Sequence, residues 1–352
     1  MNIKILVYPK DTNHYQEELY KNMENVIITY LSGPTKSATL NNLLLPFLIF
    51  KYRLSGYKIF HLHWAYGLTF YGDNYISYLI STIYYYFILI FIKICGYKIV
   101  WTVHNVLPHK KLFLNDTRER RFLAKVASIK IVHSKHTINE MKNINLNISN
   151  TSVIPHGNYI DSYPNEITKI NARKILGINN PDFVYLFFGR IEKYKGIENL
   201  LKAYTKLNFK NSKLIIAGTC KDNDLKKILN KYRDAKNIII KDQYIPDNEI
   251  QTYMNASDIV VYPFEKVTTS GSVLLSLSFS RPIIYHNIGN LIELPNNIGY
   301  AYNDELKLVE VLKQASSNEI SDITLNAFKY ACTLNWVDIS EDTKKLYQAI
   351  IT

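Results

Sequence analysis

The sequence predicts an α/β protein of two domains, each built on a parallel sheet. Apolar runs of strand length alternate along the chain with segments of helical periodicity, an order typical of parallel sheets. At 352 residues the chain is long enough for two domains that each bury a core. A composition of 47% hydrophobic and 20% charged residues is typical of globular proteins and argues against disorder.

The segment Phe183 to Ala203 has the pattern of a strand, a basic turn and a helix. Phe183 to Phe188 is continuously apolar, which predicts a strand buried on both faces. Gly189 ends the strand, and Arg190 and Lys195 lie in the turn before the helical periodicity begins. A glycine turn and a helix N-terminus favour anions, and Arg with Lys suits a diphosphate. The alternative interpretation is a solvated basic turn.

A second anion-binding pattern lies at residues 263–282, after a predicted strand at Ile259 to Tyr262. Four small residues precede an apolar helix there, so their N–H groups would form another anion site: Thr269, Ser270, Gly271 and Ser272.

The first half of the chain opens with a predicted strand at Ile3 to Tyr8. The loop that follows it contains Asn13, His14 and Tyr15, and a helix is expected from Glu17. Ligands of open α/β sheets bind beyond the carboxyl ends of the strands, so this loop lies where a ligand is expected.

Histidines accompany two further predicted strands. His61 and His63 share one face of the strand Lys58 to Trp64, and satisfied core histidines are favoured over metal ligands because no third ligand is spaced nearby. His104, at the end of another strand, is followed by Asn105 and His109. A histidine at the end of a strand is suited to acid–base chemistry or to hydrogen-bonding a ligand; the alternative is a turn histidine bonded to the backbone.

The net charge of +12 is concentrated in the first half of the chain. Residues 1–160 hold 18 basic and 8 acidic residues, a net of +10. Nucleic acid, anionic lipid or a phosphorylated substrate would suit such a surface. Nucleic acid is not expected, because stacking aromatics are missing from the basic cluster formed by Lys110, Lys111, Arg118, Arg120, Arg121, Lys125 and Lys130. The three scattered cysteines favour a reducing compartment.

Residues 74–92 form an uncharged, tyrosine-rich helix of spanning length. A strand-like segment follows at residues 96–105 and needs partners in the same domain, so a helix that covers the sheet or lies at a membrane surface is favoured over a span. We therefore expect a cytoplasmic protein, peripheral on the inner face of the cell membrane and attached by lipid electrostatics.

The segment GRIEKYKGIENLL resembles the G-R-x-x-x-x-K-G segment of GT-B glycosyltransferases, similar to the family-4-like enzymes of bacterial polysaccharide and capsule synthesis. HN followed by PH at 104–109, and IPHG at 154–157, also resemble that superfamily. The resemblance implies two Rossmann-like domains with parallel sheets that face a cleft. They would comprise residues 1–163 for the acceptor and 164–334 for the donor, with a C-terminal helix at 335–352 that returns to the first domain.

The resemblance also implies roles for residues. Gly189, Arg190 and Lys195 would bind the donor diphosphate together with residues 269–272, and Tyr244 and Ile245 would bracket the nucleobase. On the acceptor side it places Asn13, His14, Tyr15, Asn105 and His109, with His104 and Glu265 as catalytic candidates.

One departure from the family pattern concerns the acidic residues. Many retaining members have two Glu about eight positions apart, but Val267 and Leu275 occupy those positions and Glu265 lies two residues early. The role of Glu265 and the stereochemical outcome therefore stay open.

The function implied is transfer of a hexose from a UDP- or GDP-sugar to a glycan or lipid-linked acceptor, without a metal or other cofactor. The alternatives are a nucleotide-sugar epimerase on the same fold, a non-catalytic nucleotide-sugar-binding protein and a basic nucleic-acid-binding protein.

Overall fold

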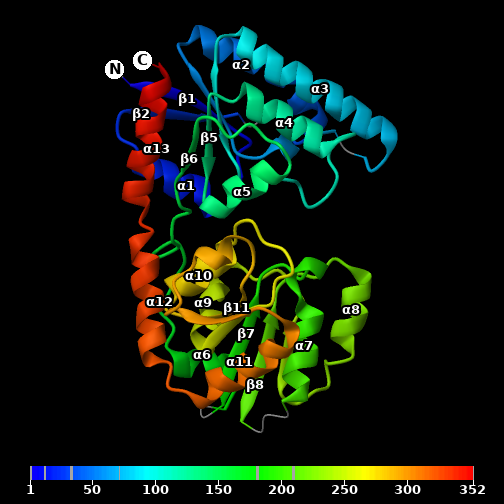
Figure 1. Ribbon diagram of the computed structural model, residues 1–352, viewed down its shortest axis with the longest axis vertical. Helices are drawn as coiled ribbons and strands as arrows, with labels where there is room; N and C mark the ends of the chain where they lie inside the picture. The colour runs from blue at the N-terminus through cyan, green and yellow to red at the C-terminus, as the bar shows by residue number, and fades with distance from the viewer. Residues whose placement is uncertain are drawn as a thin grey trace. The chain divides into compact units, whose positions relative to one another are not determined.

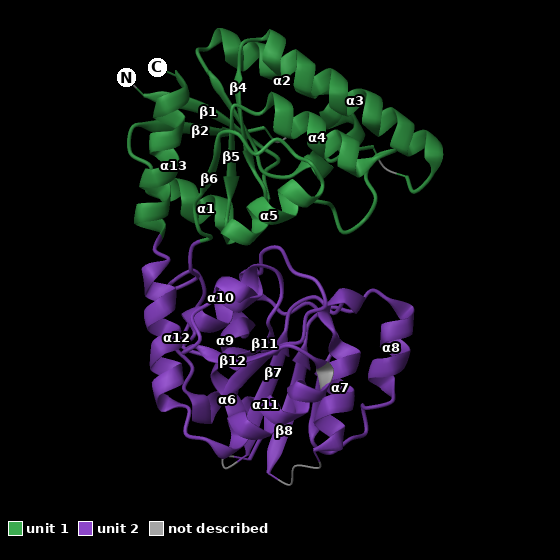
Figure 2. Ribbon diagram, viewed as in Figure 1, with its two compact units in different colours: residues 1–156, 336–352 green, residues 157–335 purple. Residues whose placement is uncertain are grey.

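The computed structural model describes residues 2–11, 13–31, 35–70, 72–179, 182–207 and 211–351. The chain divides into two compact units (Figures 1 and 2). Unit 1 comprises residues 1–156 and 336–352, and unit 2 comprises residues 157–335. The sequence analysis placed the boundary at 163/164, whereas the contacts divide the chain between His156 and Gly157.

Unit 1 contains a six-stranded parallel sheet in the order β2-β1-β3-β4-β5-β6. Strand pairing is parallel throughout. Its strands are β1 (Ile3–Tyr8), β2 (Val26–Tyr30), β3 (Ile59–Leu62), β4 (Lys98–Thr102), β5 (Ile129–Val132) and β6 (Thr151–Val153).

Helices cover both faces of this sheet, and each face has its own apolar core. One core packs against α2 (Ala38–Leu54), α3 (Tyr75–Ile94), α4 (Asp116–Val126) and α5 (Lys135–Asn143), and the other against α1 (His14–Lys21) and α13 (Trp336–Ile351). A short 3-10 helix, η1 (Ala65–Leu68), follows β3.

Helix α13 completes unit 1 although it comes last in the chain. The Ser340 hydroxyl donates to the Leu19 carbonyl at 2.6 Å, and the Tyr347 hydroxyl lies 2.6 Å from Nδ1 of His61. Tyr347 is fully buried, and the Trp336 ring meets the Tyr15 ring edge-on at 5.3 Å. These contacts place the final helix in the core shared by α1 and the sheet.

Unit 2 contains a second six-stranded parallel sheet in the order β12-β11-β10-β7-β8-β9. The strands are β7 (Phe183–Phe188), β8 (Ser212–Ala217), β9 (Ile238–Lys241), β10 (Ile259–Tyr262), β11 (Ile283–His286) and β12 (Gly299–Tyr302). Its helices are α6 (Lys169–Leu176), η2 (Lys193–Lys195), α7 (Ile197–Lys206), α8 (Asn223–Asn230), α9 (Asp247–Ala256), α10 (Gly271–Ser278), η3 (Gly289–Glu293), α11 (Glu305–Ser317) and α12 (Ser321–Thr333).

A buried carboxylate fixes α6 to the start of the unit 2 sheet. Asp258 is 8% exposed and accepts hydrogen bonds from the Arg173 guanidinium at 2.7 Å and from the Val184 N–H at 2.7 Å. Lys169 also pairs with this carboxylate. A buried charge needs such partners, because its desolvation is otherwise uncompensated.

The two-domain α/β prediction is confirmed, but the predicted start of helix α1 was wrong. Helix α1 begins at His14 rather than Glu17 because Asn13 caps it. Helix α4 begins at Asp116, because Asn115 caps it and the Asp116 carboxylate accepts from the N–H groups of Leu112 and Phe113. Pro246 is the N-cap of α9.

Candidate functional site

The strand orders locate the candidate sites. In unit 2 the chain winds outward in opposite directions from β7 and β10, so the topological switch point lies between these two neighbours. In unit 1 the corresponding point lies between β1 and β3. Crevices at the carboxyl ends of strands beside a switch point are where open α/β sheets bind ligands.

Two loops meet at the unit 2 switch point. Gly189 follows β7 with a φ of 118°, a conformation that favours glycine. A Cβ at this position would lie 3.4 Å from Nζ of Lys195 and 4.0 Å from Cβ of Ser272. The Glu265 N–H donates to the Tyr194 carbonyl at 2.8 Å, which joins the loop after β10 to the loop after β7. The predicted diphosphate residues Gly189, Lys195 and Ser272 are therefore neighbours.

Lys195 has an environment suited to an anion. The pKa of its ammonium group is lowered to about 8, mainly by burial; nearby Glu192 opposes this shift and Arg190 adds to it. A cation that is partly desolvated in the free protein gains more from an incoming phosphate than a fully hydrated one does. Arg190 is exposed at the surface of the same turn.

The loop after β10 has hydroxyl groups that do not cap helix α10. Helix α10 begins at Gly271, and its N-cap, Ser270, makes no side-chain capping bond. Instead the Ser270 hydroxyl lies 3.0 Å from the Ser272 hydroxyl. The Thr269 hydroxyl is buried and has no hydrogen-bond partner among the described residues. A buried polar atom without a partner is costly in the free protein, so a ligand that bonds it would recover that cost.

The other predicted donor-side residues differ in exposure. Tyr244 is 72% exposed, so its ring is available to stack on a base. Ile245 is 6% exposed and its side chain packs in the core, so any contact with a base would come from its main chain. The side chain of Glu265 is exposed and therefore accessible to a ligand.

Unit 1 has a row of histidines along the carboxyl edge of its sheet, one after each of four neighbouring strands. We call His63, His104, His133 and His156 the histidine row. Successive ring centroids are 5.6, 5.3 and 5.5 Å apart. The Tyr15 ring contacts all four imidazoles, with centroid distances from 4.8 to 5.8 Å. Of these four histidines, only His104 is a catalytic candidate on sequence grounds.

Hydroxyl groups satisfy the buried histidines next to β3. The Tyr20 hydroxyl lies 2.8 Å from Nδ1 of His61 and 2.8 Å from Nε2 of His63. The Thr102 hydroxyl lies 2.8 Å from Nε2 of His61. Both histidines are at most 1% exposed. The expectation that they are satisfied core histidines is confirmed.

Burial keeps these imidazoles neutral at pH 7. It lowers the pKa of His61 to about 3 and that of His133 to about 4, with the Ile154 carbonyl opposing the shift at His133. The pKa of His63 and of His104 lies well below its ordinary value because of burial, with neighbouring imidazoles adding to the effect. His104 is partly exposed, and its Nε2 lies 3.3 Å from Nδ1 of His63. A neutral imidazole at this edge is suited to hydrogen-bonding a sugar hydroxyl.

The remaining acceptor-side predictions fall around this row. Asn13 caps α1 and accepts from the Tyr15 N–H at 2.6 Å, while Tyr15 is 2% exposed and supports the histidine row. His14 pairs with Glu17 at 3.7 Å. Asn105 is partly exposed and His109 exposed on the loop after β4. Tyr15 therefore holds His104 in place rather than lining an open surface.

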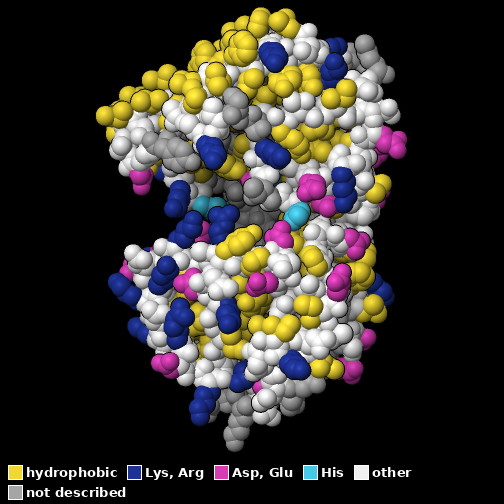
Figure 3. All heavy atoms as spheres, turned by 180° about the vertical axis from the view of Figure 1, so that it is seen from behind, with side chains coloured by type: hydrophobic (Ala, Val, Ile, Leu, Met, Phe, Trp, Pro, Cys, Tyr) yellow, Lys and Arg dark blue, Asp and Glu magenta, His cyan; other side chains and the backbone are white. Residues whose placement is uncertain are grey.

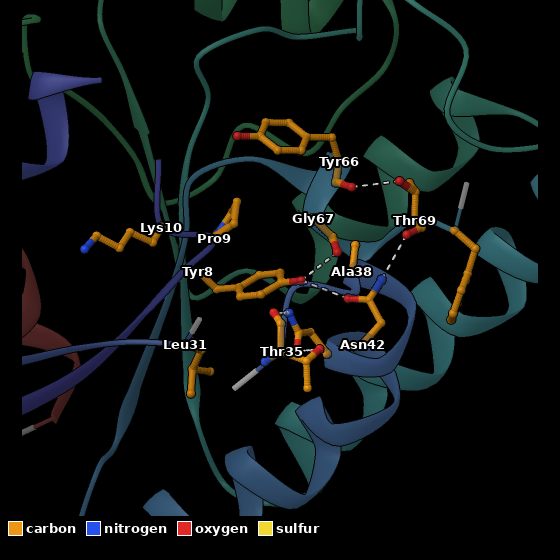
Figure 4. Close-up of a pocket in the computed structure, with 12 residues that line it drawn as sticks. Tyr8, Pro9, Lys10, Leu31, Thr35, Ala38, Asn42, Tyr66, Gly67 and Thr69 are labelled. Atoms are coloured by element: carbon orange, nitrogen blue, oxygen red, sulfur yellow. Dashed lines mark hydrogen bonds between the residues drawn. The ribbon is translucent and has the colours of Figure 1, made fainter. Parts of the chain in front are cut away.

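A cavity of about 500 Å³ lies at the unit 1 switch point (Figure 4). Pro9 and Lys10, after β1, line it together with Tyr66, from the 3-10 helix after β3. The Tyr8 hydroxyl lies 2.5 Å from the Gly67 carbonyl oxygen and 3.0 Å from Asn42 Oδ1, and its single hydrogen can be donated to either. Aromatic rings beside fixed amide and hydroxyl groups form a lining that suits a saccharide. The sequence analysis missed this cavity, although Pro9 and Lys10 belong to a loop that it singled out.

Among the described residues no group of three or more His, Cys, Asp or Glu side chains is placed to hold a metal ion. Within the histidine row the neighbouring rings of His63 and His104 stack, with their centroids 5.6 Å apart.

Residues 168–322 match the family model described as "Glycosyl transferases group 1". One similar curated protein is the GDP-mannose:glycolipid 4-beta-D-mannosyltransferase of Xanthomonas campestris pv. campestris (strain ATCC 33913), 26% identical over 233 residues. That alignment covers 66% of this chain and 62% of the relative, so the chain spans about three fifths of the length of the relative.

Solved structures share the whole fold. Sucrose-phosphate synthase from Thermosynechococcus elongatus superposes with a TM-score of 0.76 at 14% identity, over 100% of this chain and 99% of that one. Anabaena Alr3699/HepE in complex with UDP gives a TM-score of 0.74 at 16% identity, over 99% and 100%. The chain therefore has the GT-B fold of these solved structures, and residues 168–322 of unit 2 are similar to a glycosyl transferases group 1 domain.

Proposed function

We propose that the protein transfers a hexose from a UDP- or GDP-sugar to a glycan or lipid-linked saccharide in the synthesis of a bacterial surface polysaccharide. One observation carries the proposal. Bare backbone at Gly189, the Lys195 ammonium group and the buried, unpartnered Thr269 hydroxyl gather at the unit 2 switch point. This combination provides cations and donors for a diphosphate where α/β sheets bind ligands.

The chemistry assigned to these residues is stabilisation of the leaving group. When the sugar–phosphate bond breaks, negative charge develops on the diphosphate. Arg190, Lys195 and the N-terminus of α10 would offset that charge, so the donor loops do not need a metal ion for this step. His104 and Glu265 are proposed to contact the reacting sugars, His104 as a neutral imidazole.

Two of the relatives support the choice of substrates. The name of the Xanthomonas campestris relative specifies GDP-mannose and a glycolipid acceptor, and the Anabaena structure contains UDP. The cavity in unit 1 is our candidate for the acceptor saccharide. The three free cysteines fit a reducing compartment, which agrees with a cytoplasmic protein.

The test is a panel of sugar nucleotides screened for protection from thermal unfolding, because a ligand that binds only the native state raises its apparent stability. For the best donor, Arg190→Ala and Lys195→Ala should each weaken binding by about 1.5–3 kcal/mol, the range for hydrogen bonds to charged groups. Lys193→Ala is the matched control, because Lys193 lies in the same turn but pairs with Asp222 at 3.4 Å. Unchanged affinity in both Arg190→Ala and Lys195→Ala would refute the diphosphate site.

Product analysis separates the alternatives. Incubation with the donor and a saccharide acceptor should give a glycosylated product and free nucleoside diphosphate. An epimerised sugar nucleotide from the donor alone would favour the epimerase, and binding without any turnover would favour a non-catalytic protein. Retention of nucleic acid with a steep salt dependence would indicate the fourth alternative.

A further inference from the structure

Helices α2 and α3 of unit 1 each have an exposed apolar stripe in addition to the face that they bury. On α3 the buried face includes Tyr85, Ile88 and Ile92. Large side chains between 45% and 77% exposed recur every three or four residues on the other side: Ile76, Ile80, Ile83, Phe87, Ile90 and Ile94. This spacing follows one side of an α-helix.

Helix α2 repeats the arrangement. Asn42, Leu45 and Ile49 are buried, while side chains between 44% and 75% exposed form the outer stripe: Leu40, Leu43, Phe47, Phe50 and Leu54. A helix that is apolar on all sides is suited to a buried position or to lipid. The sequence analysis predicted no helix at residues 38–54, so this second stripe is a finding of the structure.

The two helices lie side by side and run in the same direction (Figure 1). The Tyr84 hydroxyl donates to the Asn42 carbonyl, and Nε of Arg53 donates to the Cys95 carbonyl at 2.7 Å. We call the eleven exposed residues of the two stripes the α2–α3 face. Figure 3 shows hydrophobic side chains gathered over the part of unit 1 that contains these helices.

The segment of sequence that contains this face is strongly basic. Between Asn25 and Asn115 the sequence contains one acidic residue, Asp73, and eight basic ones: Lys36, Lys51, Arg53, Lys58, Lys93, Lys98, Lys110 and Lys111. The segment therefore carries a net charge of +7, and neither α2 nor α3 contains an acidic residue. Lys51 and Lys93 are exposed on these helices, and Lys111 lies over the Tyr78 ring at 4.9 Å.

We propose that the α2–α3 face lies in the headgroup and upper acyl region of an anionic bilayer, with the surrounding lysines on lipid phosphates. Apolar stripes bordered by basic residues are the pattern of helices that lie in a membrane surface. A second copy of the chain would bring two segments of +7 together, so self-association through this face is disfavoured.

The proposed attachment leaves the fold intact. Helix α3 is the one described helix that is long and apolar enough to cross a membrane, but a third of its most apolar window is buried inside the protein. The next strand, β4, pairs with β3, so a span would separate two strands of one sheet. Two basic residues of the cluster at 110–130, Arg120 and Lys130, are buried and cannot contribute to this surface, which corrects the expectation from the sequence.

The α2–α3 face also lies next to the candidate acceptor cavity. The link between the two rests on the proposed function. The first turns of α2 line the unit 1 cavity through Ala38, Asn41 and Asn42, while Leu40 and Leu43 begin the outer stripe. One helix thus borders both the candidate saccharide site and the lipid-facing surface. The saccharide of a lipid-linked acceptor would reach the cavity while its lipid anchor stays in the bilayer.

Co-flotation of the full chain with vesicles tests the proposal. We expect binding to vesicles that contain phosphatidylglycerol, about tenfold weaker binding to pure phosphatidylcholine, and release from the anionic vesicles in high salt. The variant Phe47→Ser with Ile83→Ser should reduce binding to anionic vesicles at least tenfold. Both side chains are more than 60% exposed, so the fold should survive. The matched control is Ile170→Ser with Leu306→Ser in unit 2, also more than 60% exposed.

Four results would overturn the proposal: no binding to anionic vesicles at low salt, equal binding to neutral ones, equal loss in the control variant, or retention through both high salt and carbonate. Conversion of a dimer to a monomer by Phe47→Ser with Ile83→Ser, without vesicle binding by the parent protein, would assign the face to a second copy instead. Thermal protection by the donor nucleotide is measured on the same variants. It should be unchanged, so failure of the membrane proposal and failure of the donor site can be told apart.

Discussion

Each unit has a six-stranded parallel sheet with one topological switch point, but the two units collect different chemistry at the carboxyl edge. Unit 2 gathers glycine backbone, hydroxyls and cations around Gly189 and Lys195, a setting for negative charge. Unit 1 gathers imidazole rings that burial keeps uncharged. Eight of the nine histidines and all three tryptophans belong to unit 1. The difference teaches that topology selects where a ligand binds, whereas the residues that end the strands select its charge.

The largest expected difference between the units is the loss of stability of unit 1 in acid. Histidines have an ordinary pKa of about 6.5, and the folded protein lowers those of His61 and His133 to about 3 and about 4. Between a pH of about 6.5 and these lowered pKa values, the histidines are protonated in the unfolded chain but neutral in the folded protein. The stability of unit 1 should therefore fall as the pH drops below about 6.5. Each such histidine lowers the free energy of unfolding by about 1.4 kcal/mol per pH unit in this range. His61, His63 and His133 together would therefore lower it by up to about 4 kcal/mol per pH unit.

Tryptophan fluorescence measures this effect selectively, because Trp64, Trp101 and Trp336 all lie in unit 1. Thermal unfolding followed by fluorescence at about pH 7.5 and about pH 5.5 should show a lower midpoint in acid. His133→Gln should flatten this dependence. A pH-independent midpoint would contradict the neutral, buried state of the row.

Loss of Asp258 should be the largest single destabilisation of unit 2. Asp258→Ala leaves the Arg173 guanidinium, 3% exposed, without its carboxylate. Breaking a buried pair in this way costs about 3–5 kcal/mol, measured by denaturant unfolding. Glu310→Ala is the control, because the exposed pair of Lys307 and Glu310 should contribute less than about 1 kcal/mol. Equal effects of the two substitutions would remove the distinction between the buried and exposed pairs.

Substitution of His104 tests the role of the histidine row in turnover. His104→Ala should lower turnover by about a hundredfold, since a positioned acid–base or hydrogen-bonding side chain is lost. His104→Gln keeps a hydrogen-bonding group, so it should retain more activity if the imidazole contacts a hydroxyl rather than taking a proton. His136→Ala, on α5, is the control outside the row. Near-normal turnover of a folded His104→Ala would assign His104 a structural role.

The smallest expected effect concerns the unpartnered hydroxyl in unit 2. Thr269→Val removes a buried Oγ1 that bonds nothing among the described residues, so the free protein should keep its stability or gain slightly. Donor binding should weaken by about 0.5–1.5 kcal/mol, the contribution of an ordinary hydrogen bond. Thr205→Val, at an α7 hydroxyl bonded to the Leu201 carbonyl, is the control for donor affinity. If donor affinity is unchanged, the Thr269 hydroxyl does not face the ligand.

Local patterns in the sequence were enough to predict the fold class and the strand that ends at Gly189. The continuous apolar run at Phe183–Phe188 and the glycine after it depend only on neighbouring residues, and both appear in the structure as predicted. The roles of the site residues remain predictions. Element ends were less accurate, because caps such as Asn115 compete with helical periodicity over single residues.

The histidine row and the unit 1 cavity depended on information that is spread along the chain. His63, His104, His133 and His156 are separated by 23 to 41 residues, and only the order of β3 to β6 makes them neighbours. A usable signal existed, since each histidine lies one to three residues after a strand. The outer stripe of α2 was missed because Pro46 interrupts the helix pattern.

The place of α13 also sets an order of events during protein synthesis. Unit 2 is continuous in the sequence, so all of its residues have been made once Asn335 is joined to the chain. Unit 1 begins first but needs Tyr347 to contact His61 and Ser340 to contact Leu19. On the ribosome, the half of the protein that is translated first is therefore the half that is completed last.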